Sequence, residues 1–451
     1  MKIAIDAFGG DNAPDEVVKG AVDAVKEYGV DIVLTGDTKK LDECFERLGL
    51  SKDHITFEQA DGVIEIEDNP KMILKEKKNC SMGVAMQMVA DGRADAMISA
   101  GSTAALVMGG TLIVKRIKGV KRPSLTPVMP GLNNMYILLD GGANVDCRPD
   151  MLRQFAVMGS VYMNKIMGVA SPKVGLLNVG AEEEKGRELE QETYALLKNS
   201  TLNFTGNVEA RNAALGEVDV VVTDGFTGNI YLKTVEGMGK FMKASLKKIF
   251  FRNLGTKIGA MFTMKGIKEI SKQMDYRETG GSPLLGTAKP VLKAHGSSDA
   301  LAFKNAVRQA KDFVERNVIA EMEKVLSEEG IQADRQALAL IASQAQGGMR
   351  DALSLLDQCA GMSGGEITLE KAQQVLGAAG SDQVERMAQS IADRQVRQTL
   401  AQLQQIYDNG ADLSVFVREM IDYYRERMIE CAEQTEGQWA MEAMLLLAQA
   451  E

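Results

Sequence analysis

Asn178–Gly186 reads NVGAEEEKG, and the fold can be worked out from this stretch outward. It follows Lys173–Leu177, a short apolar run typical of a buried strand. It precedes Gly186–Asn199, in which apolar residues recur at helical spacing. The stretch is therefore predicted to connect a strand to a helix. In open α/β sheets, such connections lie at the carboxyl ends of the strands, where ligands bind.

The same stretch holds three consecutive carboxylates, Glu182, Glu183 and Glu184, followed by Lys185. Adjacent carboxylates repel one another, so holding three of them together at a sheet edge is unfavourable without a reason. One interpretation is that they serve a functional site there. The other is a solvated helix N-terminus, where acidic residues interact favourably with the helix dipole. The stretch alone leaves both interpretations open.

Length and composition limit the class of protein. A chain of 451 residues exceeds one compact domain, so two or three domains are expected. The N-terminus MKIAIDAFGG starts directly as a strand and does not resemble a signal peptide. Five scattered cysteines and two histidines favour reduced thiols and a cytoplasmic location, and argue against a disulfide framework or a metal centre.

The net charge of −10 is unevenly distributed along the chain. From Val325 onward there are 9 basic and 20 acidic residues, which leaves 43 basic and 42 acidic residues before it. Such a shift predicts a domain boundary near residues 324–331, with an N-terminal domain over 1–324 and an all-helical domain over 325–451. In the first part, strand and helix patterns alternate, which predicts a three-layer α/β/α domain with a mostly parallel sheet.

Small-residue loops follow five of the predicted strands. In chain order they read DAFGGD (6–11), SAGSTAA (99–105), DGGANVD (140–146), NVGAEEEKG (178–186) and DGFTGN (224–229). Glycines let backbone N–H groups approach a ligand, and a helix N-terminus favours an anion. We expect the five loops to lie on one edge of the sheet as an anion-handling site. The sequence contains neither a P-loop nor a G-x-G-x-x-G after the first strand.

Lys240–Lys272 carries nine basic residues and only one acid, Glu269, with apolar residues interleaved at helical spacing. This pattern predicts two or three basic amphipathic helices. They are either a solvated face over the core or a surface for an acidic partner or an anionic membrane. Nucleic acid is not expected, because the segment has no tyrosine or tryptophan for stacking.

Two further loops, YRETGGSPLLG (276–286) and AHGSSDA (294–300), precede a helix predicted over Ala302–Lys324. The second loop places His295 beside two hydroxyls and a carboxylate. A lone histidine is usually structural, but in this setting His295 is a candidate for holding an anion or donating a proton.

Taken in order, these loops closely resemble those of bacterial phosphate acyltransferase, the acyl-[acyl-carrier-protein]:phosphate transacylase of phospholipid synthesis. The resemblance covers about residues 1–324. It implies a phosphotransacetylase-like fold and reversible formation of acyl phosphate from acyl carrier protein thioester and inorganic phosphate. It also implies a cytoplasmic homodimer that associates peripherally with the membrane, a membrane glycerol-3-phosphate acyltransferase that uses the product, and no cofactor or metal.

The resemblance and the loop chemistry together give a set of candidate site residues. The candidates for catalysis are Lys185, His295, Glu182 and Glu183. The candidates for phosphate or substrate binding are Asp6, Gly9, Gly10, Asp11, Ser102, Thr103, Asn144, Asp146, Thr227, Gly228, Asn229, Ser297 and Ser298. The candidates for a carrier-protein or membrane surface are Lys243, Lys247, Lys248, Arg252, Lys257, Lys265 and Lys268. Ser102 and Asn212 stand where the family usually has asparagine and aspartate.

The remaining sequence differs in kind. Ala333–Gly365, which contains GGMRDALSLLDQ, resembles the lid and the start of the collar of the DNA polymerase III clamp-loader gamma/tau subunit. Arg350 matches the nucleotide-sensing arginine of that family, but no P-loop precedes it, so ATPase activity is not expected. The segment is then either an oligomerisation or partner-binding module, or a helical passenger joined to the enzyme.

Three functions are carried forward. The first is an acyltransferase that makes acyl phosphate. The second is a replication-related scaffold that acts through the helical C-terminal domain. The third is a catalytically silent protein of the lipid interface, in which the basic helices are the active part.

Overall fold

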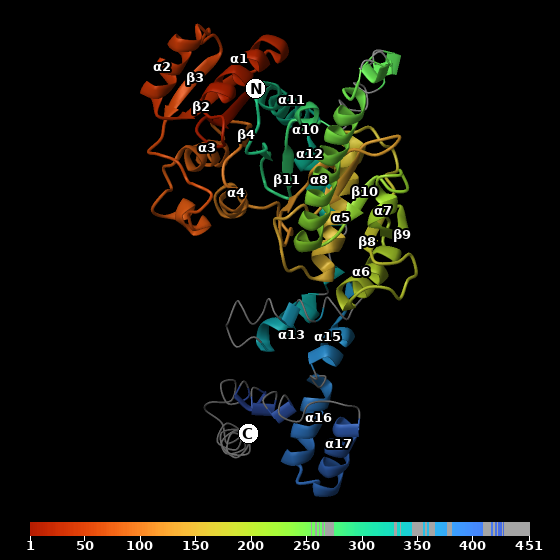
Figure 1. The fold of residues 1–451 in the computed structure, drawn as a ribbon. Helices are drawn as coiled ribbons and strands as arrows, with labels where there is room; N and C mark the ends of the chain where they lie inside the picture. The colour runs from red at the N-terminus through yellow and green to blue at the C-terminus, as the bar shows by residue number, and fades with distance from the viewer. Residues whose placement is uncertain are drawn as a thin grey trace. The chain divides into compact units, whose positions relative to one another are not determined.

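The chain folds into two compact units, Met1–Glu328 and Glu329–Glu451 (Figure 1). The computed structural model describes residues 1–253, 255–257, 259–260, 262–263, 266, 275–328, 332–333, 335–344, 355–356, 359, 366–376, 381–408, 416–417, 420–421, 423–425 and 427.

The first unit contains a seven-stranded sheet in the order β3-β2-β1-β4-β12-β11-β5. The first five of these strands run parallel, whereas β11 is antiparallel to both of its neighbours. The strands are β1 (Lys2–Asp6), β2 (Asp31–Gly36), β3 (Ile55–Gln59), β4 (Ala96–Ser99), β5 (Ser124–Leu125), β11 (Ser282–Leu285) and β12 (Val291–Lys293).

Alternate residues of this sheet enter two separate cores, as the period of a strand requires. Ile3 and Ile5 face one core, which is closed by α1 (Asp15–Tyr28), α2 (Thr38–Leu48) and α11 (Ala300–Glu315). Ala4 faces the other core. The elements that cover that face are α3 (Ser81–Ala90), α4 (Thr103–Gly109), η1 (Pro70–Leu74) and η2 (Gly110–Val114).

A second sheet of five strands has the order β6-β7-β10-β8-β9 and is parallel except for β6. Its strands are β6 (Val128–Met129), β7 (Tyr136–Leu139), β8 (Val174–Asn178), β9 (Phe204–Glu209) and β10 (Val220–Val222). One face packs on α5 (Pro149–Lys165), α6 (Glu188–Lys198) and α12 (Val318–Glu328). The other packs on α7 (Ala210–Ala213) and the start of α8 (Gly225–Phe250). The short helix α10 spans Tyr276–Thr279.

The three-layer α/β/α class expected from the sequence is confirmed, but the strands divide between two sheets. The five loops therefore lie on two carboxyl edges instead of one. The loops after β1 and β4 lie on the first sheet, and those after β7, β8 and β10 lie on the second. The single helix expected over Ala302–Lys324 is wrong, because α11 ends at Glu315 and Asn317 adopts a left-handed conformation (φ 51°) before α12.

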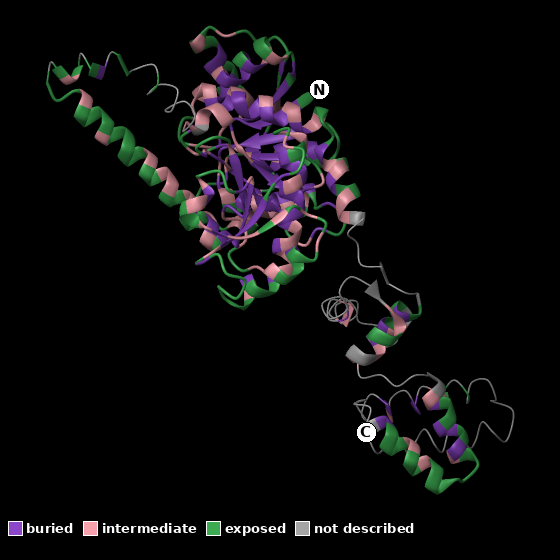
Figure 2. Ribbon diagram, turned by 90° about the vertical axis from the view of Figure 1, so that its right-hand side faces the viewer, coloured by how far each residue is buried: buried purple, intermediate pink, exposed green. Residues whose placement is uncertain are grey.

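Helix α8 includes the first part of the basic stretch and is mostly exposed (Figure 2). Of its 26 residues, only Gly225, Gly228 and Tyr231 are buried. The Tyr231 hydroxyl shares a hydrogen bond of 2.6 Å with Tyr136 of β7, which fixes the first turns of α8 to the second sheet. Beyond those turns, Met238, Phe241 and other large apolar side chains face solvent.

The second unit is mainly helical in its described residues. It contains α13 (Arg335–Gln344), α15 (Leu369–Leu376), α16 (Ser381–Ala392) and α17 (Val396–Asp408). A two-residue parallel ladder joins Gln332–Ala333 to Glu366–Ile367. Two small cores hold these elements, one around Ala337 and Ala372 and one around Met387 and Phe416. Arg350 lies outside the described residues.

We expect Phe155→Ala to destabilise the first unit, because this fully buried ring packs in the core between the second sheet and α5. The free energy of unfolding should fall by about 3–5 kcal/mol, the cost of removing a buried phenyl ring. Leu215→Ala, at a half-exposed position, is the control and should change the free energy of unfolding by less than about 0.5 kcal/mol. Urea unfolding followed by circular dichroism measures both, and equal effects would contradict the packing described.

Candidate functional site

The loop after β1 is organised by Asp6, whose carboxylate is buried at the end of the strand. It accepts hydrogen bonds from the Ser99 hydroxyl at 2.6 Å and from the Phe8 N–H at 3.3 Å. Ser99 Oγ in turn accepts from the Gly101 N–H at 3.0 Å. Burial raises the pKa of Asp6 above its usual value. Asp6 therefore joins the ends of β1 and β4, and its oxygens are already occupied by protein donors.

Gly9 and Gly10 let three loop ends meet. A Cβ on Gly9 would lie 2.8 Å from the Gly101 nitrogen, and one on Gly10 would lie 2.8 Å from the Ala100 side chain. Gly10 also has a φ of 99°, which favours glycine. The Asp11 N–H donates to the Gly296 carbonyl at 2.8 Å. The loops after β1, β4 and β12 thus converge, and we call this region the first loop cluster.

Three candidate residues of the first loop cluster come from the loop after β12. His295 is exposed, and its Nδ1 accepts from the Ser297 N–H at 3.2 Å and lies 2.8 Å from the Ser297 hydroxyl. Removal of part of the ring's surface from water, with Lys233 and other lysines nearby, lowers the pKa of His295. Ser298 is 1% exposed, and its hydroxyl has no hydrogen-bond partner among the described residues.

The structure places Ser102 and Thr103 at the start of α4. Ser102 is buried, and its Oγ accepts from the Ala105 N–H at 3.5 Å as the N-cap of the helix. Thr103 is half-buried in the first helical turn. In this cap the Ser102 oxygen accepts a hydrogen bond. The Ser102 hydroxyl can therefore still donate its hydrogen to a bound ligand.

Asp140 organises the loop after β7 in the same way as Asp6 organises the loop after β1. Its fully buried carboxylate accepts N–H bonds from Leu125 at 2.9 Å and from Asn144 at 2.6 Å. The Asn144 side-chain amide adds a third contact at 3.0 Å. Burial raises the pKa of Asp140 to about 6. Asn144 therefore shapes this loop, while Asp146, two residues on, is exposed.

A third buried carboxylate, Asp224, caps α8 after β10. It accepts from the Thr227 N–H at 2.7 Å and from the Thr227 hydroxyl at 2.9 Å. Arg187 donates to it at 2.6 Å, which ties the end of the Asn178–Gly186 stretch to the start of α8. These contacts, together with a bond of 2.7 Å from the Gly225 N–H to the Asn144 carbonyl, define the second loop cluster.

Gly228 and Asn229 lie where α8 touches the loop after β7. A Cβ on Gly228 would lie 1.9 Å from the Asp140 carbonyl, so only glycine permits this contact. Asn229 is exposed, and its Cβ would lie 3.3 Å from a Cβ on Gly142. Both residues therefore belong to the second loop cluster.

The acidic run is solvent-exposed along its whole length. Glu183 forms an ion pair of 2.8 Å with Lys198, the last residue of α6. Glu182 and Lys185 instead lie over Gly180, where a Cβ would meet the Glu182 carboxylate at 2.7 Å and the Lys185 stem at 3.1 Å. The structure thus groups Glu182 with Lys185 and separates them from Glu183.

Helix α8 connects the two loop clusters. Asn229 in its first turns touches the loop after β7, and the charges of Lys233, Glu236 and Lys240 further along act on His295. Lys233 also acts on Lys293 at the end of β12. Helix α8 therefore contacts the second loop cluster, and its charged side chains act electrostatically on two residues of the first.

The candidate site residues drawn from the sequence did not include Arg187, Asp140, Asp224 or Lys293, although Asp140 and Asp224 begin two of the five loops. The roles of Asp140 and Asp224 could have been found, because an aspartate directly before glycine at a strand end often binds its own loop. Lys293 gave no such signal, since a lysine at the end of a strand usually faces solvent.

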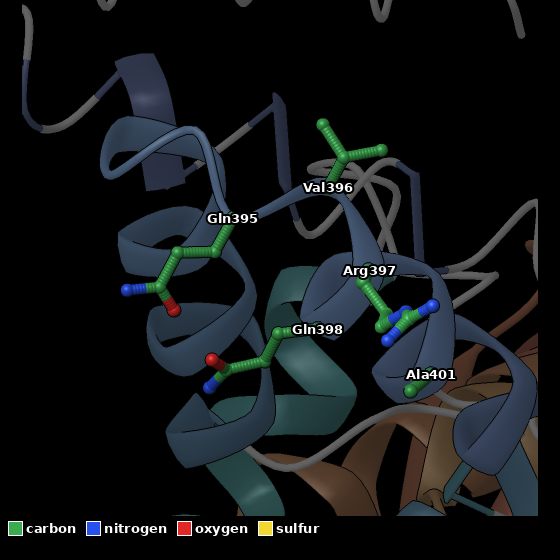
Figure 3. Close-up of a pocket in the computed structure, with 5 residues that line it drawn as sticks. All are labelled: Gln395, Val396, Arg397, Gln398 and Ala401. Carbon is green, nitrogen blue, oxygen red and sulfur yellow. The ribbon is translucent and has the colours of Figure 1, made fainter.

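The surface predicted on the basic stretch is described only in part. Lys243, Lys247, Lys248, Arg252 and Lys257 are exposed, whereas Lys265 and Lys268 lie outside the described residues. A separate hollow in the second unit is lined by Gln395, Val396, Arg397, Gln398 and Ala401 at the start of α17 (Figure 3). It has amide, apolar and guanidinium groups but no carboxylate or hydroxyl, and it holds none of the predicted site residues.

We expect Asp140 to titrate with a pKa of about 6, far above an exposed aspartate. Because the folded-state pKa is raised, the ionised form is the less stable one, and the unfolding free energy contributed by Asp140 falls as pH rises from about 4 to about 6. Carboxyl-carbon NMR should show this titration, and the signal should vanish in Asp140→Asn. An Asp140 signal that titrates near pH 4 would contradict the burial described.

Comparisons with known proteins match the two units to different families. A family model described as fatty acid synthesis protein matches residues 1–321. A model of the ATPase lid domain of a DNA polymerase III clamp loader subunit matches residues 317–365. A model of domain III of the DNA polymerase III subunits gamma and tau matches residues 367–443.

Two relatives cover the first unit almost completely. The phosphate acyltransferase of Thermoanaerobacterium thermosaccharolyticum is 48% identical over 325 residues, which are 72% of this chain and 96% of the relative. That of Clostridium acetobutylicum is 46% identical over 329 residues, 73% of this chain and 99% of the relative. A phosphotransacetylase structure from Streptococcus pyogenes aligns over 71% of this chain and 94% of its own, with 20% identity and a TM-score of 0.48. Through residues 1–321, the chain belongs to the family of fatty acid synthesis proteins that includes the phosphate acyltransferases.

Proposed function

We propose that the chain is a phosphate acyltransferase that converts the thioester of acyl carrier protein and inorganic phosphate into acyl phosphate, reversibly, in phospholipid synthesis. The observation that carries the proposal is the identity of 46–48% to phosphate acyltransferases over nearly their whole length. The two glycine-rich loop clusters along α8 support it, because phosphate and a thioester need convergent backbone donors.

In the proposed reaction, a phosphate oxygen attacks the thioester carbonyl carbon and forms a tetrahedral oxyanion. The C–O bond to phosphate forms, the C–S bond breaks, and the thiolate of the carrier leaves. No covalent acyl-enzyme is needed, and the sequence has no G-x-S-x-G elbow. Phosphate would lie in the first loop cluster, against Gly9, Gly10, Ser102, Thr103 and Ser297. Asp6 and Asp11 would position those loops.

The geometry of His295 suits the role of a hydrogen-bond donor better than that of a general acid. Its Nδ1 accepts from the Ser297 N–H, so the hydrogen of the neutral ring is on Nε2. Its pKa is lowered, so the ring is neutral near pH 7 and is a weak proton donor. A neutral imidazole can still stabilise the oxyanion through Nε2–H. We therefore assign His295 to that contact.

Lys185 is the candidate for a second contact to the developing charge. It is exposed beside Glu182 over Gly180, and its loop is held to Asp224 through Arg187. Glu182 can orient the ammonium or take up a proton, whereas Glu183 is engaged with Lys198. Asn144, Asp146, Thr227, Gly228 and Asn229 would shape the thioester side of the site.

The exposed lysines of α8 are the proposed surface for acyl carrier protein, which is acidic, or for an anionic membrane. Lys243, Lys247 and Lys248 alternate there with exposed Met242, Leu246 and Ile249. Mixed basic and apolar exposure suits both partners. Among the described helices, none combines the length and apolar character needed to cross a bilayer.

Several further features are proposed on family grounds. We infer a cytoplasmic homodimer without a cofactor, peripherally bound to the membrane, that passes acyl phosphate to a membrane glycerol-3-phosphate acyltransferase. The second unit would take no part in the chemistry. The scaffold alternative is weaker, since the sequence lacks the P-loop that would give the lid a nucleotide.

We expect His295→Ala to lower kcat by about 10²–10³-fold, the effect of losing one oxyanion donor. His295→Gln, whose amide N–H can donate, should lose less. His54→Ala is the control, because His54 is exposed and paired with Asp31 on the amino side of β3. Initial rates of acyl phosphate formation from palmitoyl-acyl carrier protein measure all three.

Equal losses in His295→Ala and His295→Gln would show that the ring acts as an acid or base, not as a donor. Lys185→Ala is measured beside Lys173→Ala, which removes an exposed lysine just before the opposite end of β8. If Lys185→Ala and His295→Ala both keep normal turnover, the assigned roles are wrong.

We expect Lys247→Glu with Lys248→Glu to raise the KM for acyl carrier protein thioester by roughly 3- to 10-fold at low salt, with kcat little changed. The difference should shrink as salt screens the surface charges. Lys26→Glu with Lys118→Glu makes the same change of net charge at exposed positions away from α8 and is the control. An unchanged KM, together with loss of binding to anionic vesicles, would assign the surface to the membrane instead.

A further inference from the structure

Lys293 lies where two loops of the first loop cluster, those after β4 and β12, meet. It is the last residue of β12, where it pairs in register with Ser99 of β4. Its ammonium donates to the Ala100 carbonyl at 3.2 Å and to the Ala294 carbonyl at 2.5 Å. One side chain thus holds the loops after two neighbouring strands and keeps one of its three N–H bonds free within the described part of the chain.

The charge of Lys293 is poorly compensated. The side chain is half-buried, yet within the described residues no carboxylate lies within ion-pair distance of its ammonium. Asp6 and Asp11 attract the charge from a greater distance, and Lys233 of α8 repels it. The effect of burial is larger than the attraction of the two aspartates, and it lowers the pKa of Lys293 to about 8. A partly buried cation without a counterion is costly, and a bound anion would remove that cost.

A second observation points to a ligand in the same loop. Ser298 is 1% exposed, and its hydroxyl has no partner among the described residues, whereas buried hydroxyls are normally hydrogen-bonded. The Asn12 side-chain amide donates a hydrogen bond of 3.2 Å to the Ser298 carbonyl, which helps to fix the loop in place. The unpaired cation at the end of β12 and the unsatisfied hydroxyl in the loop that follows are the two kinds of group that an oxyanion needs.

We propose that the Lys293 ammonium, held between the ends of β4 and β12, is the fixed cation that binds the phosphate substrate, with the Ser298 hydroxyl as a second donor. This inference rests on the proposed function, since it names where the attacking phosphate lies. The two carbonyl contacts fix the ammonium before the substrate arrives, which reduces the entropy lost on binding.

The test is phosphate affinity measured by calorimetry on the full chain, without any acyl substrate. Lys293→Met should weaken phosphate binding by about tenfold or more, the usual effect of losing a contact to a charged group. Lys289→Met removes a lysine just before the opposite end of β12 and should leave the affinity unchanged. In turnover, Lys293→Met should raise the KM for phosphate far more than it lowers kcat, a split that a merely structural lysine would not produce.

Wild-type affinity should also fall as the pH rises through about 8, because Lys293 loses its proton there. Inorganic phosphate gains negative charge as the pH rises, so the ligand itself cannot cause a loss. The charged and titratable groups that act on Lys293 are Asp6, Asp11, Lys233 and the neighbouring His295. This measurement needs no variant, so it still tests phosphate binding by Lys293 if Lys293→Met does not fold.

Two outcomes would overturn the inference and are distinguishable. A wild-type chain that forms acyl phosphate, but whose phosphate affinity is insensitive both to Lys293→Met and to pH, overturns the role of Lys293 alone. A wild-type chain that neither binds phosphate nor forms acyl phosphate overturns the proposed function as well.

Discussion

The loops of this protein depend on buried aspartates that accept hydrogen bonds at the ends of strands. Asp6, Asp140 and Asp224 are each at most 3% exposed, and each accepts backbone N–H groups of the loop that follows. A carboxylate removed from water must be satisfied by protein donors, so each loop can take few other conformations. The cost of burial is visible in the raised pKa values of Asp6 and Asp140.

Fixed loops bring backbone and side chains together at defined places. The Asp6 contacts leave Gly9 and Gly10 against the loop after β4, and the Asp224 contacts fix both the start of α8 and, through Arg187, the acidic run. Donors that are held in place before a substrate arrives do not have to reorganise as charge develops on it. The two loop clusters and α8 between them are therefore suited to a reaction in which both the nucleophile and the intermediate are anions.

Much of this could be predicted from the sequence, because strand-end loops rich in glycine have a local signature. The five loops and most parallel strands were found this way. The division into two sheets was not, since β9 (FTGNVE) and β11 (SPLL) lack a continuous apolar run or contain proline. The roles of Ser102 and Thr227 were also hidden, because a hydroxyl that hydrogen-bonds within its own helix N-terminus and one that binds phosphate occur in the same sequence context. The break at Asn317 depends on a single residue within an otherwise helical pattern.

In the proposed reaction, the chain joins inorganic phosphate to the acyl carbon of a thioester. The most direct measurement is to incubate the full chain with palmitoyl-acyl carrier protein and phosphate labelled with ¹⁸O in every position, and to weigh the product by mass spectrometry. We expect acyl phosphate that retains all of the label, because the bridging oxygen comes from the attacking phosphate. No acyl phosphate, or only palmitate released by hydrolysis, would contradict it.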